Sequence, residues 1–100
     1  MLSVLLGQKE GYTFYYSLRD GTDVSGCGLK EGELVCDENC TQKELMLRTL
    51  INKCMNDGIA RVFTRDVWGQ DLARFGFERE GDIFVSDAEK LRLPHDCKHG

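Results

Sequence analysis

The chain has 100 residues, of which 41% are hydrophobic and 30% are charged, and its net charge is −4 at pH 7. These values predict one globular domain over residues 1–100. They argue against nucleic-acid binding, because the lysines and arginines are scattered among acids and form no cationic cluster.

The chain opens with the apolar run Met1–Leu6, which we interpret as a strand. It lacks the basic start and the small-residue cleavage site of a signal peptide. No apolar run of the sequence approaches the roughly 20 residues that a membrane-spanning helix needs. We therefore expect a cytoplasmic protein with no membrane partner.

The first forty residues alternate apolar segments of strand length with polar turns that contain glycine. Glycine suits such turns because it adopts positive φ without steric cost. Short turns of this kind join neighbouring strands as hairpins. The pattern predicts an antiparallel meander of four strands, Leu2–Leu6, Tyr12–Leu18, Val24–Leu29 and Leu34–Cys36.

A helix is predicted over Thr41–Asp57. Thr41 followed three residues later by Glu44 is typical of a capping box, and Gly58 supplies a left-handed stop. Apolar residues recur between them at helical spacing. The stripe expected to face the core consists of Leu47, Leu50, Ile51, Cys54 and Met55.

Three strands and a second helix are predicted after Gly58. The strands are Ile59–Thr64, Phe77–Glu80 and Ile83–Ser86, with Gly81-Asp82 as a tight turn. The second helix is capped by Asp66, places Trp68, Leu72 and Phe75 inward, and ends at Gly76. A right-handed crossover through the long helix makes the fourth and fifth strands parallel. The fold class is therefore α/β (α+β), with a mixed, mostly antiparallel sheet in the order β-β-β-β-α-β-α-β-β and a polar tail over residues 87–100.

Two segments carry a resemblance to a known family. In Asp71–Phe77 a short helix ends in a Gly-Phe pair that starts the next strand, and Asp20-Gly21 precedes Val24-Ser25-Gly26 in a predicted hairpin. With the element order over residues 12–86, they resemble the C-terminal half of the GNAT N-acetyltransferase superfamily, in a shortened and divergent form. The resemblance implies an acyl-CoA N-acyltransferase-like fold and transfer of an acetyl group from acetyl-CoA to a small-molecule amine of unknown identity, by direct attack of the amine on the thioester.

The resemblance also implies where the cofactor would bind. In the family, backbone groups of the fourth strand polarise the thioester carbonyl, and the start of the following helix holds the pyrophosphate. The corresponding cofactor-binding residues here are Val35, Cys36, Cys40, Thr41, Gln42 and Lys43. No residue matches a general acid or base of the family, which leaves Glu33 and Tyr16 as the catalytic candidates.

Two features depart from the family pattern. Loop 37–44 contains no glycine and three acids, and Asp37 and Glu38 would repel a pyrophosphate. Leu72 stands where the family has its general-acid tyrosine. These departures favour a rival interpretation: a non-catalytic GNAT-like binding or dimerisation module without cofactor, in which a sheet edge or face pairs two chains.

The helix start also allows two interpretations that do not depend on the family. Its free N–H groups, over residues 39–43, form an anion site with Lys43 beside it. Alternatively, the start is an ordinary capped helix whose donors are used by Thr41 and Glu44. The second interpretation is favoured.

Five cysteines at irregular spacing are predicted to be free thiols and not a disulfide framework. Cys27 and Cys54 are expected to be core residues, and Cys40 to be structural and not a nucleophile. Thiolates and imidazoles are zinc ligands, so a zinc-dependent adaptor is a third interpretation. Its ligands would come from Cys36, Cys40, His95, Cys97 and His99, but their spacing does not match a zinc knuckle, and no metal site is predicted.

The aromatic residues also allow two interpretations. Trp68 and the tyrosines Tyr12, Tyr15 and Tyr16 either line a ligand pocket or belong to the core and the sheet faces, and their spacing favours the second. Tyr15 lies on the opposite face of its strand from Tyr16. It is therefore the tyrosine expected to be exposed or at an interface.

Overall fold

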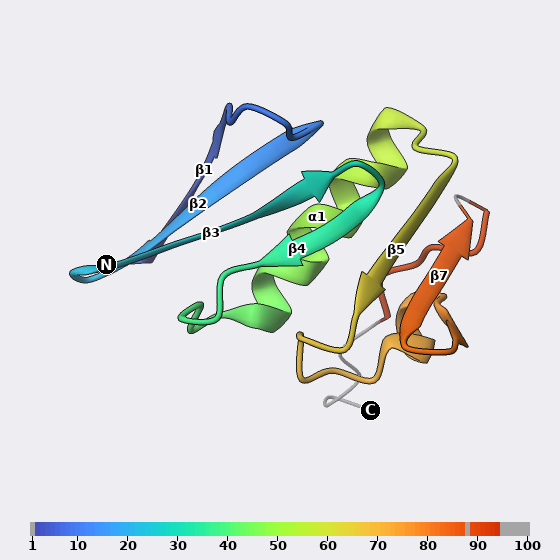
Figure 1. The fold of residues 1–100 in the computed structure, drawn as a ribbon. Coiled ribbons are helices and arrows are strands. Elements are labelled where there is room, and N and C mark those ends of the chain that lie inside the picture. Colours follow the sequence, from blue (N-terminus) through green and yellow to red (C-terminus); the bar gives the residue numbers. More distant parts are fainter. Residues whose placement is uncertain (1, 88, 95–100) are drawn as a thin grey trace.

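The described residues of the chain form a seven-stranded sheet with one α-helix packed against it (Figure 1). The computed structural model describes residues 2–87 and 89–94. The strands lie in the order β1-β2-β3-β4-β5-β7-β6, with β4 and β5 parallel and the other neighbouring pairs antiparallel. In chain order the elements are β1 (Leu2–Gly7), β2 (Phe14–Asp20), β3 (Asp23–Lys30), β4 (Glu33–Cys36), α1 (Lys43–Asp57), β5 (Arg61–Arg65), the 3-10 helix η1 (Leu72–Phe75), β6 (Glu78–Glu80) and β7 (Ile83–Asp87).

The predicted antiparallel meander of four strands is confirmed as β1 to β4. Two-residue turns join β2 to β3 and β3 to β4, and Gly21 and Gly32 adopt positive φ in them. β2 begins at Phe14 and not at Tyr12, because the Tyr12 N–H donates to the Lys9 carbonyl in a turn. The parallel pairing of β4 with β5 is confirmed as well.

Helix α1 is confirmed, but its predicted capping box is wrong. The N-cap is Gln42, whose side chain caps no N–H group. The Thr41 hydroxyl donates to the Asp20 carboxylate, and Glu44 pairs with Arg48 along the helix. At the other end, Gly58 takes the predicted left-handed conformation and its N–H donates to helix carbonyls.

The apolar stripe of α1 is predicted correctly at four positions. Leu47, Leu50, Ile51 and Cys54 are fully buried. Met55 was expected in the stripe and is exposed, whereas Met46 is buried in its place. Met46 and Met55 flank the stripe on its two sides. The face that contacts the sheet is therefore rotated about the helix axis toward Met46 and away from Met55.

The second predicted α-helix is wrong: only the four-residue 3-10 helix η1 forms. Gly69 adopts positive φ and interrupts the segment, so that Asp66 does not cap it. The Asp71 carboxylate caps η1 by accepting the Ala73 N–H, and Gly76 ends it in the left-handed region as predicted. The observed order therefore departs from β-β-β-β-α-β-α-β-β at its second helix.

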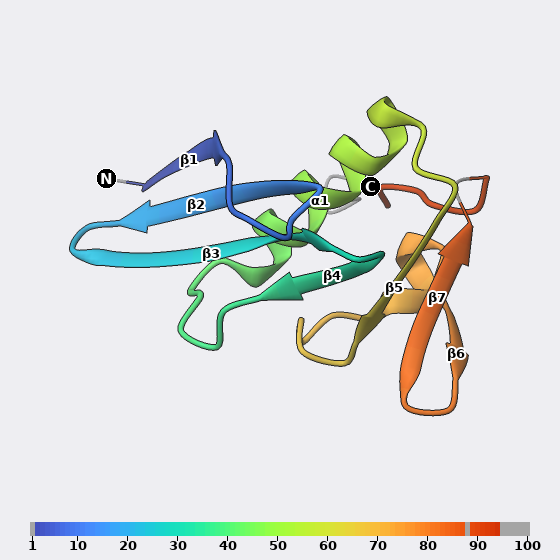
Figure 2. The ribbon, with the colours of Figure 1, turned by 45° about the horizontal axis from the view of Figure 1, so that its top comes forward.

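All of the helical cover lies on one face of the sheet, which we call the helix side. The core there joins α1 and η1 to inward residues of the strands, including Leu18, Leu29 and Val62. Among the described residues, no helix covers the other face, which we call the open face (Figure 2). The helix and the strands that carry the predicted site therefore form two layers.

The two edges of the sheet differ in length and charge. β6 has three residues, Glu78-Arg79-Glu80, and all are exposed. β1 has six residues, none of them charged. No helix in the described part of the chain is long and apolar enough to cross a membrane.

Candidate functional site

The site assigned to a cofactor lies where β4 and β5 run side by side. Only two residue pairs join the strands, Glu33 opposite Phe63 and Leu34 opposite Thr64. Beyond these pairs the strands diverge toward their carboxyl ends, as Figures 1 and 2 show. We call this separation the β4–β5 wedge.

A buried hydrogen-bonded relay occupies the helix side of the wedge. The Thr64 hydroxyl donates to the Leu34 carbonyl at 2.7 Å, and the Trp68 indole N–H donates to the Thr64 hydroxyl at 2.8 Å. Thr64 and Trp68 are both buried, with 0% and 1% of their surface exposed. Protein atoms therefore fill the space beside the last β4–β5 pair, and Trp68 is a core residue and not part of a ligand pocket.

No pattern in the sequence predicted this relay. Thr64 was expected only as the end of a strand. A polar residue that ends an apolar strand, with an indole four positions later, is a weak signal, because the loop between them decides whether the two side chains meet.

The acidic loop after β4 is anchored to β3. The Asp37 carboxylate accepts the Gly26 N–H at 2.8 Å, and the Asp37 N–H donates to the Gly26 carbonyl at 2.9 Å. The Asn39 side-chain amide donates to the Val24 carbonyl at 3.1 Å. The carboxylate thus has a structural partner on β3, on the other side of β4 from β5.

The structure brings together only some of the predicted cofactor-binding residues. The Cys40 thiol and the Lys43 ammonium group lie close enough to the Cys36 thiol to change its pKa. Val35 lies opposite Gly28, at a position on the open face. The Thr41 hydroxyl is already bonded to Asp20. The side chain of Gln42 caps no N–H group of the helix.

Burial raises the pKa of two thiols near the wedge, Cys36 and Cys27. Burial, with the neighbouring Cys40 thiol, raises the pKa of Cys36 to about 12. Burial also raises the pKa of Cys27, which lies opposite Cys36 on β3. All four described cysteines are free thiols, as predicted.

The described residues contain no group of three or more metal-ligand side chains arranged around a common point. Cys36 and Cys40 belong to these residues. The other proposed zinc ligands, His95, Cys97 and His99, lie outside the described residues. The zinc interpretation is therefore without geometric support in the part of the chain that the structure describes.

The two catalytic candidates lie on opposite faces of the sheet. Glu33 is on the open face, where its carboxylate pairs with Arg65 at 3.5 Å. Tyr16 lies opposite Cys27 on the helix side and packs edge-to-face against Phe14. The structure therefore does not bring Glu33 and Tyr16 into one site.

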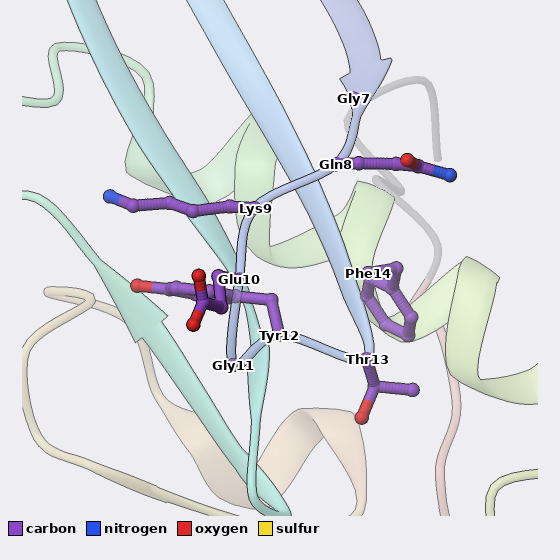
Figure 3. Close-up of a pocket in the computed structure, with 8 residues that line it drawn as sticks. All are labelled: Gly7, Gln8, Lys9, Glu10, Gly11, Tyr12, Thr13 and Phe14. Atoms are coloured by element: carbon purple, nitrogen blue, oxygen red, sulfur yellow. The ribbon is translucent and has the colours of Figure 1, made fainter.

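A cavity of about 420 Å³ lies at the β1–β2 loop and is lined by residues 7–14. Figure 3 shows Lys9 and Tyr12 extending to one side of the loop and Gln8 and Phe14 to the other. The Tyr12 and Tyr15 rings meet edge-to-face, with their centres 5.1 Å apart. The ammonium groups of Lys9 and Lys30 lie 5.5 and 5.6 Å from the centre of the Tyr12 ring. The lysine contacts are cation–π interactions.

These tyrosines pack on glycines of β3. A Cβ atom at Gly26 would collide with the Tyr15 ring, and one at Gly28 would collide with Tyr12. Because the two glycines have no Cβ atom, the two rings pack closely against the open face, and Tyr15 is half-buried by this packing and not fully exposed. The cluster stabilises the loop, and its chemistry assigns no ligand.

Comparisons of the chain with protein-family models, with curated proteins and with solved structures each find no match. The resemblance to the GNAT superfamily therefore stays a prediction from the sequence.

Proposed function

We propose that the protein is a non-catalytic assembly module built on a GNAT-like scaffold. The observation that carries the proposal is the relay from Trp68 through Thr64 to the Leu34 carbonyl, which fills the helix side of the β4–β5 wedge. In the family that the sequence resembles, this strand would carry the cofactor. Here the carbonyl that lies at the wedge is already bonded within the protein.

Two further features support the proposal. The Asp37 carboxylate is held against β3 by its bond from the Gly26 N–H, near the Cys36 thiol at the end of β4, where its charge opposes an anionic ligand. Leu72, at the position of the family's tyrosine, is buried in the core and has no group that transfers a proton. The residues present therefore do not fit acetyl-CoA, and no chemical step is assigned to it.

The proposal is tested by calorimetric titration of acetyl-CoA into the purified protein. We expect heats equal to those of dilution at millimolar cofactor, because the helix side of the wedge is filled and the loop is acidic. Saturable binding with a dissociation constant of micromolar order, about −8 kcal/mol, would overturn the proposal.

One observation favours a second candidate, an acetyl-CoA-dependent N-acetyltransferase. No side chain caps the start of α1, so its first N–H groups are free to face an anion, with Lys43 next to them. Binding that is lost in Lys43→Glu and kept in Lys9→Glu, which makes the same charge change on the β1–β2 loop, would support this candidate. Loss in both variants would indicate a general charge effect.

A further inference from the structure

The free edge of β1 is unprotected against pairing with another strand. β1 pairs with β2 on one side and has no neighbour among the described residues on the other. Its residues Leu2, Leu5 and Leu6 are 43%, 60% and 58% exposed. Edge strands usually carry charges, proline or bulges that prevent pairing, and β1 has no charge or proline along its length.

The direction of the backbone groups of β2 follows from the turn that ends it. The two-residue turn makes Asp20 and Asp23 the hydrogen-bonded pair that closes the β2–β3 hairpin. Bonding alternates along an antiparallel strand. Leu18 and Tyr16 therefore also face β3, and the residues between them face β1.

The same alternation fixes the groups at the free edge. Arg19 and Ser17 lie opposite Ser3 and Leu5, so these residues of β1 use their N–H and C=O groups on β2. The intervening residues of β1 present their N–H and C=O groups to the free edge. These residues are Leu2, Val4 and Leu6.

The three residues with free backbone groups also share one face of the sheet. Val4 lies opposite Leu18, whose side chain is in the core, so Leu2, Val4 and Leu6 are on the helix side. A cavity of about 340 Å³ adjoins Leu6 there, between the β1–β2 corner and the end of α1 at Lys53 and Asp57. Apolar side chains and unpaired backbone groups thus coincide along one strand.

We propose that β1 pairs antiparallel with β1 of a second copy of this chain, about a two-fold axis perpendicular to the sheet. Val4 lies opposite Val4 of the partner, and Leu2 lies opposite Leu6. This register pairs all three residues that have free backbone groups, whereas a shift by two residues leaves one of them unpaired within β1. The inference rests on the proposed assembly function and names its partner.

The charge of the two edges favours a closed dimer over a chain of copies. Pairing β1 with β6 would form an open filament. It would also place uncharged leucines beside Glu78 and Glu80, on a strand of only three residues. Pairing β1 with itself leaves no further uncharged edge, so the assembly closes at two copies.

The test is sedimentation equilibrium of the full chain and of charge variants on β1. We expect a dimer for the unchanged protein. Leu2→Lys and Leu6→Glu alone should each raise the dimer dissociation constant at least about tenfold, because a charge then faces a leucine. The double variant should recover the dimer, because each lysine then faces a glutamate of the other copy.

Leu45→Lys is the matched control, since Leu45 is also exposed but lies on α1, and we expect it to leave the dimer unchanged. A monomeric unchanged protein, single variants that stay dimeric, or a double variant that stays dissociated would each overturn the inference. Circular dichroism of each variant confirms that it is folded. If the unchanged protein is a monomer and does not bind acetyl-CoA, the dimer proposed here is refuted. The proposal that the protein is non-catalytic then still holds.

Discussion

At the scale of single residues, Thr64 connects the sheet to the segment that follows it. Its hydroxyl donates to Leu34 and accepts from Trp68, so it satisfies two buried polar groups at once. A buried polar group without a partner is destabilising by about 1–3 kcal/mol. The relay therefore contributes to the stability of the fold and at the same time fills the helix side of the wedge.

Thr64→Val should lower the free energy of unfolding by about 1–3 kcal/mol, because the buried Trp68 N–H loses its acceptor. Thr49→Val is the matched control. The Thr49 hydroxyl bonds to the Leu45 carbonyl on the exposed side of α1, where water replaces it, so we expect a change below about 0.5 kcal/mol. Urea denaturation measures both, and equal effects would contradict the relay.

The thiol of Cys36 should react slowly with iodoacetamide. Its pKa is raised to about 12, so the reactive thiolate is scarce near neutral pH. At pH 8 we expect the alkylation of Cys36 to be at least about tenfold slower than in the urea-unfolded chain. The alkylation rate should still rise above pH 9, whereas a free thiol of pKa about 8.5 is already mostly ionised there. Peptide mapping by mass spectrometry follows the residue, and a rate that levels off by pH 9 would refute the raised pKa.

At the scale of elements, the sequence predicted most of the strands and the long helix. Strand alternation and glycine turns depend on residues close together in the sequence. The meander and the end of the helix at Gly58 could therefore be predicted. The prediction of a capping box was wrong because the Thr41 hydroxyl donates to Asp20, a residue distant in sequence. The prediction of a second α-helix was wrong because the left-handed conformation of Gly69 and the buried side chain of Trp68 determine the path of the chain after β5.

The candidate site was harder to predict than the fold. The resemblance to the GNAT family assigned Cys36, Cys40 and Lys43 to one cofactor site, and the three side chains lie near one another in the structure. The relay that fills the helix side of the wedge depends on a contact between β4 and the segment after β5. No local pattern of residues encodes such a contact.

Gly76 joins η1 to the last strands by a close backbone approach. Its φ is +95°, its carbonyl accepts the Ser86 hydroxyl, and a Cβ atom there would collide with the Lys90 carbonyl. Gly76→Ala should therefore destabilise the fold by more than about 2 kcal/mol. Gly81→Ala is the control, because Gly81 has φ +66° but open space around it, so we expect about 1 kcal/mol. Equal losses in thermal or urea denaturation would refute the close approach.

At the scale of the whole molecule, the sheet is asymmetric in both its faces and its edges. Helices cover one face, one edge is short and charged, and the other is long and apolar. A closed dimer through β1 removes the apolar edge from water. This asymmetry, with the helix side of the wedge filled, is the basis of the assembly function that we propose.

The most direct test of that claim is a nitrogen-15 NMR spectrum of the protein with and without acetyl-CoA. Trp68 is the single tryptophan, so its indole N–H gives one resolved signal at the wedge. Because this N–H is buried and bonded to Thr64, we predict slow hydrogen exchange and an unchanged position at millimolar acetyl-CoA. A signal that exchanges rapidly, or that shifts saturably with the cofactor, would show that the wedge opens to a ligand and would contradict the non-catalytic function proposed here.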